Sequence, residues 1–116
     1  MNRKAVAKQL IRLAKILTAK KVIANWEIRK AHVDGQQVVE VYLYSDSEVE
    51  KDEFDGHVDA LKMALSRAVK RYGWKFREQA MSGSKKRWQK TLIYGPDVGS
   101  QNDVFDAATK VLRSEL

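Results

Sequence analysis

The chain has 116 residues, of which 44% are hydrophobic and none is cysteine, and its formal net charge is +7 at pH 7. This length fits a single domain over residues 1–116 with a hydrophobic core of its own. The lack of cysteine excludes a disulfide framework and a thiolate zinc site. No apolar run is long enough to span a membrane, and we expect a cytoplasmic protein.

The first 21 residues contain seven basic residues and no acidic one. Four apolar residues recur at the spacing of one helix face: Val6, Leu10, Leu13 and Leu17. Four basic residues form a stripe on a different face: Lys4, Lys8, Arg12 and Lys15. This pattern predicts a basic amphipathic helix over residues 1–20, peripheral to the rest of the domain. Its bases are either simply solvated or contact phosphates or a membrane surface, and the lack of a bulky aromatic residue favours phosphates over a membrane.

Two β-rich runs between residues 22 and 45 flank the Asp34-Gly35 pair, which is the strongest short signal for a two-residue hairpin turn. The resulting register places four apolar residues on one side: Trp26, Ile28, Val41 and Leu43. On the other side Arg29 faces Glu40 as an opposite-charge pair. That side also carries three apolar or aromatic residues: Val38, Tyr42 and Tyr44. We expect part of it to be covered, and we expect the tyrosines to stack on bases if it is open.

Residues 45–73 predict a central helix that ends at Gly73. Its apolar stripe contains Phe54, Val58, Leu61, Leu65, Ala68 and Tyr72. Acidic residues gather at its front and basic residues at its back, as the helix dipole favours. The pattern leaves two starting points open, near Glu48 or near Asp55.

The segment from Trp74 to Tyr94 contains six basic residues and one acidic residue. We expect a second hairpin that turns around Ser82, Gly83 and Ser84. Two registers are plausible, one with Phe76 opposite Thr91 and one with Phe76 opposite Leu92. The second is favoured because it pairs aromatic with aromatic or aliphatic residues and Glu78 with Lys90. That register turns five residues toward the core: Trp74, Phe76, Trp88, Leu92 and Tyr94. It gathers polar residues on the opposite face: Lys75, Arg77, Gln79, Arg87, Gln89 and Thr91.

A last helix follows Gly95 and Pro96. Ser100 and Asp103 predict its capped start, and its apolar residues are Val104, Ala108, Val111 and Leu112. The whole order is α-ββ-α-ββ-α. It predicts an α+β fold with an antiparallel four-stranded sheet of two hairpins and with helices packed mainly on one face. The second face of such a sheet is open by default.

The sequence contains no catalytic motif. His32 and His57 have no serine or acid partner at a recognisable spacing, and the acidic stretch at 45–56 does not fit a calcium loop. We therefore predict a protein that is not an enzyme and that uses no cofactor or metal ion.

The segregated charge favours binding to nucleic acid, either DNA or RNA. The expected contact residues lie on the second hairpin and the first helix: Lys75, Arg77, Lys85, Lys86, Arg87, Gln89, Lys4, Lys8, Arg12 and Lys15. The alternative is a protein-interaction or assembly module, whose basic surface binds an acidic partner or a second copy of the chain. The chain resembles small phage and bacterial proteins in general, and no motif assigns it to a family.

Overall fold

The computed structural model describes residues 3–8, 22–45, 48–96 and 100–116. Residues 3–8 are helical. The first hairpin comprises β1 (Asn25–Val33) and β2 (Gln36–Tyr44), and the second comprises β3 (Trp74–Ser84) and β4 (Arg87–Pro96). The helix α2 (Lys51–Lys70) lies between the hairpins in the sequence, and α3 (Gln101–Glu115) follows them. The predicted α+β order is confirmed.

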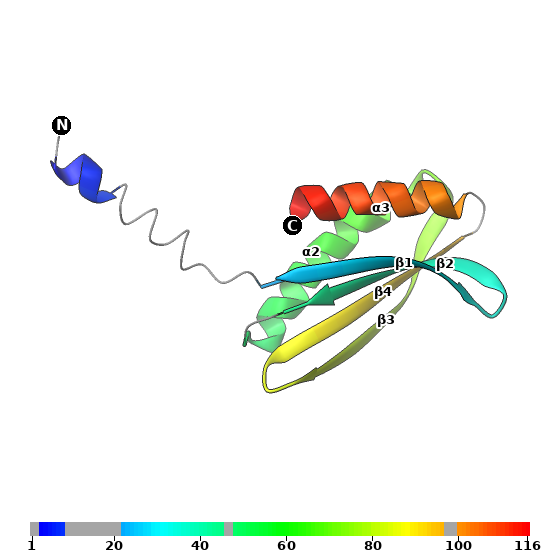
Figure 1. Cartoon of the computed structure of the whole chain (residues 1–116), viewed down its shortest axis with the longest axis horizontal. Helices are drawn as coiled ribbons and strands as arrows, with labels where there is room; N and C mark the ends of the chain where they lie inside the picture. The colour runs from blue at the N-terminus through cyan, green and yellow to red at the C-terminus, as the bar shows by residue number, and fades with distance from the viewer. Residues whose placement is uncertain (1–2, 9–21, 46–47, 97–99) are drawn as a thin grey trace.

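The four strands form one antiparallel sheet in the order β1-β2-β4-β3. Both long helices lie on the same face of this sheet (Figure 1), where α2 packs on β3 and β4 and α3 packs on β1 and β2. The central strands β2 and β4 carry most of the buried strand residues, whereas the edge strands are more polar. The opposite face of the sheet has no described helix over it, and we call it the outer face.

One hydrophobic core lies between the sheet and the two helices. The helix α2 contributes a stripe that is fully or almost fully buried: Phe54, Val58, Leu61, Leu65 and Val69. Val69 is fully buried, whereas Ala68, which was predicted in the stripe, is only half-buried. The helix begins at Lys51, between the two predicted starts. None of the described helices is both long and apolar enough to cross a bilayer.

The first hairpin has the predicted register. Ile28 pairs with Val41 and Arg29 with Glu40. Asp34 and Gly35 form the turn with φ of 51° and 79°, the left-handed backbone that a two-residue hairpin turn requires. The side chains of Trp26 and Ile28 pack against the core, as expected.

The second hairpin departs from the predicted register. Its turn is Lys85-Lys86, with φ of 52° and 61°, and not the serine and glycine residues before it. Phe76 pairs with Tyr94, two residues away from the predicted partner Leu92. A shift of two residues leaves each side chain on its original face. Trp74 is therefore still buried, and Phe76 and Trp88 still pack against the core.

A β-bulge at Arg77 changes the faces of β3 beyond that point. The register shifts between Phe76 and Glu78, so that Glu78 pairs with Ile93 and Gln79 with Leu92. Because an extra residue in one strand exchanges its two faces, Gln79 lies on the helix side and not on the outer face. The predicted pairing of Glu78 with Lys90 is also wrong. Lys90 faces the helix side and forms an ion pair with Asp55 of α2.

The last helix begins as expected, with Ser100 as its N-cap residue. The Ser100 carbonyl accepts a hydrogen bond from the Val104 amide at 3.2 Å. The Ser100 side chain, however, makes no capping hydrogen bond. The position of the N-cap residue is therefore predicted correctly, but the predicted side-chain hydrogen bond is not formed.

Candidate nucleic-acid interface

The outer face carries charges of both signs, distributed unevenly along the strands. The basic residues on it are Arg29, Lys75, Arg77 and Arg87, and the acidic ones are Glu27, Glu40 and Glu78. All three acids lie farther from the β3–β4 turn than the row of outer-face residues that is closest to this turn. The two ends of the outer face therefore differ in chemistry.

The middle of the outer face is occupied by contacts within the protein. The Arg29 guanidinium donates to Glu27 at 2.8 Å and lies 5.0 Å from the centre of the Tyr42 ring. The Tyr42 hydroxyl donates to Glu40 at 3.0 Å. Partial burial, and then the hydrogen bond to Glu40, raise the pKa of Tyr42. These side chains satisfy one another and present few free groups to a ligand.

Arg77 covers the end of the outer face near the β1–β2 turn. Its side chain passes directly over Gly95, where a Cβ atom would overlap it, and donates to Gln36 at 3.1 Å. Val38 lies on this side of β2 and is fully buried. Part of this face is thus covered, as expected, and a side chain of the second hairpin contributes to the cover. Lys75 is exposed at the same end, opposite Gly95.

The end of the outer face next to the β3–β4 turn is chemically different. A single row runs across the four strands through Asn25, Tyr44, Gln89 and Ser82. Arg87 lies two residues from Gln89 along β4, on the same face and opposite Ser84, and it is exposed. We call these six residues the turn-end surface, and none of them is acidic.

The polar groups of the turn-end surface are largely unused within the protein. The side chains of Tyr44, Arg87 and Gln89 form no hydrogen bond or ion pair with any other described residue. Asn25 uses its carbonyl oxygen to accept from the Trp26 amide at 2.8 Å. A ligand on this surface therefore meets donors and acceptors that need not break existing bonds.

The β3–β4 turn adds two lysines next to this surface, and they differ in their contacts. Lys85 is exposed and has no hydrogen-bond or ion-pair partner among the described residues. Lys86 donates to Glu50 at 2.7 Å, and this hydrogen bond and the Glu50 charge raise the pKa of Lys86. Its carbonyl accepts from the Val49 amide at 2.9 Å. Lys86 is thus directed to the acidic start of α2, and Lys85 is the base available to a ligand.

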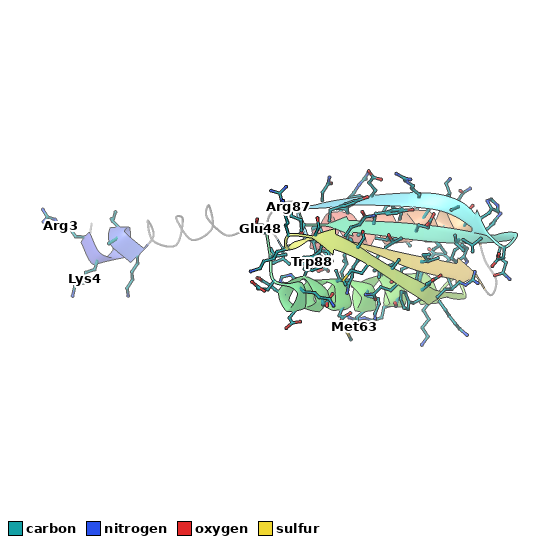
Figure 2. All side chains as sticks on the ribbon, turned by 90° about the horizontal axis from the view of Figure 1, so that it is seen from below. Arg3, Lys4, Glu48, Met63, Arg87 and Trp88 are labelled. Atoms are coloured by element: carbon teal, nitrogen blue, oxygen red, sulfur yellow. The ribbon has the colours of Figure 1, made fainter. Side chains whose placement is uncertain are left out.

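Trp88 fixes this end of the sheet. Its indole Nε1 donates to the Val49 carbonyl at 2.9 Å, and its amide donates to the Ser45 hydroxyl at 2.8 Å. The Ser45 amide in turn donates to the Trp88 carbonyl at 3.0 Å. Figure 2 shows Trp88 and Arg87 together with Glu48 at this end of the sheet. The turn-end surface is therefore held on a rigid support.

The predicted N-terminal contacts are only partly described. Lys4 and Lys8 are exposed on the helical residues 3–8, which lie apart from the sheet in Figure 1. Arg12 and Lys15 lie outside the described residues. The chain enters β1 at Asn25, which belongs to the turn-end surface. The basic N-terminal sequence therefore joins the sheet at the same end as Lys85 and Arg87, but on the opposite edge strand.

The predicted contact residues that the structure describes do not form one patch. Lys85, Arg87 and Gln89 lie together, while Lys75 and Arg77 lie at the other end of β3, about 20 Å away at 3.3 Å per residue. Sequence reasoning also missed Asn25 and Ser82 as members of the surface. Their positions follow from the strand order and the bulge, and no local sequence signal indicates either one.

No group of three or more His, Asp or Glu side chains in the described ranges is arranged to hold a metal ion. Comparisons with models of known protein families, with curated proteins and with solved structures found no match to this chain.

Proposed function

We propose that this protein binds nucleic acid through the turn-end surface, Lys85 and its basic N-terminal segment, without catalysing a reaction on it. The observation that carries the proposal is the acid-free row across the sheet, whose side chains are largely without partners among the described residues and which lies next to exposed bases. Such an arrangement offers phosphate contacts and hydrogen bonds to sugars or base edges at the same place. The proposed location is the cytoplasm, and the proposed partner is either DNA or RNA.

The charge distribution supports this proposal. The net charge of +7 includes seven bases in the first 21 residues, which join the sheet at the turn end. The acids Glu48, Glu50 and Glu53 lie at the same end but on the helix side, at or just before the start of α2. A polyanion that approaches this end is attracted to the outer face and repelled from the helix side.

Titration of labelled single-stranded and duplex oligonucleotides at low salt tests the proposal. We expect binding whose affinity falls steeply as salt increases, because each neutralised phosphate releases counterions. Charge reversal of Lys85 and Arg87 to glutamate should weaken binding, and loss of one phosphate contact should reduce the log–log salt slope by about 1. The matched control reverses Lys110 and Arg113, which are exposed on α3.

The control variant has the same net charge as the test variant, so it separates a local site from general electrostatic attraction. Equal weakening in the two variants would contradict a site at the turn end. Absence of binding to every oligonucleotide at low salt would rule out the function itself.

A protein partner is the second candidate, and self-association is its most specific form. The acidic start of α2 and Arg87 of the outer face lie at the same end of the domain but on opposite sides. Two copies can therefore place the basic surface of one on the acidic side of the other. Sedimentation at low and high salt tests this candidate. A monomer at all protein concentrations and salt concentrations would exclude self-association.

A further inference from the structure

The two tyrosines on the outer face differ in a way that indicates the form of nucleic acid bound. Tyr42 and Tyr44 are both half-buried on β2 and point to the same side. The Tyr42 ring is covered by the Arg29 guanidinium, 5.0 Å from the ring centre, and its hydroxyl is bound to Glu40. Tyr42 is therefore already engaged within the protein.

Tyr44 has no such contacts. Its ring makes no aromatic or cation–π contact with any residue in the described part of the chain, and its hydroxyl has no hydrogen-bond partner there. Its neighbours across the strands are Asn25 and Gln89, two amide side chains. A half-buried aromatic ring that is flanked by amides and has no ring contact of its own among the described residues is suited to stack on a base and to bond its edge.

The backbone around Tyr44 is fixed on both sides. The Tyr44 carbonyl accepts from the Ala24 amide at 2.8 Å, and Ser45 is tied to Trp88 by two hydrogen bonds. The ring is therefore presented by a rigid strand and not by a loop. Less conformational freedom is lost when a ligand stacks on a support that is already ordered.

The position of the Tyr44 ring favours binding of a single strand over binding of a duplex. In a duplex the faces of the bases are covered by stacking, and only their edges are accessible in the grooves. A ring that lies in the surface of a sheet can stack only on a base that has left such a stack. Arg87 and Lys85 lie beyond Gln89, toward the β3–β4 turn, and are the exposed bases next to this ring.

From these contacts we infer that the turn-end surface is a single-strand binding site in which the Tyr44 ring stacks on one base, while Gln89 bonds its edge and Arg87 and Lys85 contact the adjoining phosphates. This inference rests on the proposed nucleic-acid binding. It deepens that proposal by naming a substrate class, single-stranded DNA or RNA, and a stacking residue.

The test measures the affinity of the full chain for a labelled single-stranded oligonucleotide and for its duplex in the same buffer. Tyr44→Leu should weaken single-strand binding by at least about fivefold, the lower end of the loss of one stacking contact. Tyr44→Phe keeps the ring and should retain the affinity. Tyr42→Leu is the matched control, and it should change the affinity by less than about twofold because that ring is already covered.

A second measurement does not depend on the folding of any variant. The wild-type chain should bind an abasic strand of equal length and charge at least about fivefold more weakly than the normal strand, because no base is present to stack. Equal affinity for abasic and normal strands, or equal losses in Tyr44→Leu and Tyr42→Leu, would overturn the inference. Binding that is at least as tight to the duplex would also overturn it, while the broader proposal would stand. Failure to bind any of these strands would overturn both.

Discussion

At the scale of single residues, two glycines have roles that the sequence does not indicate. Gly83 pairs with Trp88 across the second hairpin, and a Cβ atom there would overlap the indole ring and lie 2.6 Å from the Arg87 carbonyl. At Gly95 a Cβ atom would instead meet the flexible side chain of Arg77. Both glycines allow a close approach, but only at Gly83 does backbone oppose the new atom.

We expect Gly83→Ala to lower the free energy of unfolding by about 1–3 kcal/mol, because the overlap with backbone forces the strands to shift. Gly95→Ala is the matched control. It should cost less than about 1 kcal/mol, since Arg77 can rotate away at the cost of one off-rotamer angle or one exposed hydrogen bond. Urea unfolding measures both variants. Equal losses would show that Gly83 has no particular steric role.

Tyr94 gives a residue-scale prediction for pH dependence. It is fully buried in the core, and burial raises its pKa to about 12 from an ordinary value of 10.0. A raised pKa means that the neutral phenol is favoured in the folded state. The contribution of Tyr94 to the free energy of unfolding is therefore fully present below pH 10, and it is lost as the pH rises through about 12.

The free energy of unfolding should therefore fall by about 2–3 kcal/mol between pH 10 and 12 on account of Tyr94. Lysines titrate over the same range, so the measurement compares urea unfolding of the wild-type chain with that of Tyr94→Phe. The stability difference between the two proteins should change with pH only above pH 10. A constant difference up to pH 12 would contradict the burial of the Tyr94 phenol in the folded state.

At the scale of elements, the first hairpin is predictable because its signals are local. The Asp34-Gly35 turn fixes a register, and the alternation of apolar and polar residues agrees with that register. The helices are predictable for the same reason, since their apolar stripes repeat within each segment. The single open face also follows, because two hairpins and two helices can build only one sandwiched core.

The second hairpin is not predictable in this way because tertiary contacts decide it. Its turn uses two lysines, while the glycine that resembles a turn residue serves the packing of Trp88. Lys90 resembles a surface base in the sequence, yet it is only 5% exposed and is paired with Asp55 of α2. No pattern within residues 74–94 indicates that Lys90 pairs with Asp55 or that Gly83 packs on Trp88. Because these contacts set the register, they also decide which residues of the second hairpin lie in the candidate site.

The Lys85-Lys86 turn is a strained element at the proposed site. Both residues have the left-handed backbone that asparagine and glycine adopt more readily. Replacing the pair by Asn-Gly should raise the Tm by a few degrees, although it also removes the exposed Lys86–Glu50 ion pair, which contributes little.

The same replacement removes two positive charges and should weaken nucleic-acid binding. Stability and affinity would then change in opposite directions, as expected where strain is kept for function. Thermal unfolding and an oligonucleotide titration on the same samples measure the two effects. A more stable variant with unchanged affinity would show that the lysines serve no binding role.

At the scale of the whole molecule, the fold separates the face that supports the sheet from the face that we propose binds nucleic acid. Both long helices and the large apolar side chains lie on one face of the sheet, and the tryptophans help to build that support. The opposite face is left to polar side chains, and its middle is internally paired. Among the described residues, its turn end combines polar groups without partners, the Tyr44 ring and exposed bases, at the end of the sheet where the basic N-terminal sequence enters.

Mapping backbone amide signals by NMR while an unlabelled single-stranded oligonucleotide is added tests this claim most directly. We predict that the largest changes cluster at Tyr44 and at residues 82–89, with little change on the exposed side of α3. Changes confined to the helices α2 and α3, with the signals of Tyr44 and the β3–β4 turn unmoved, would contradict the account.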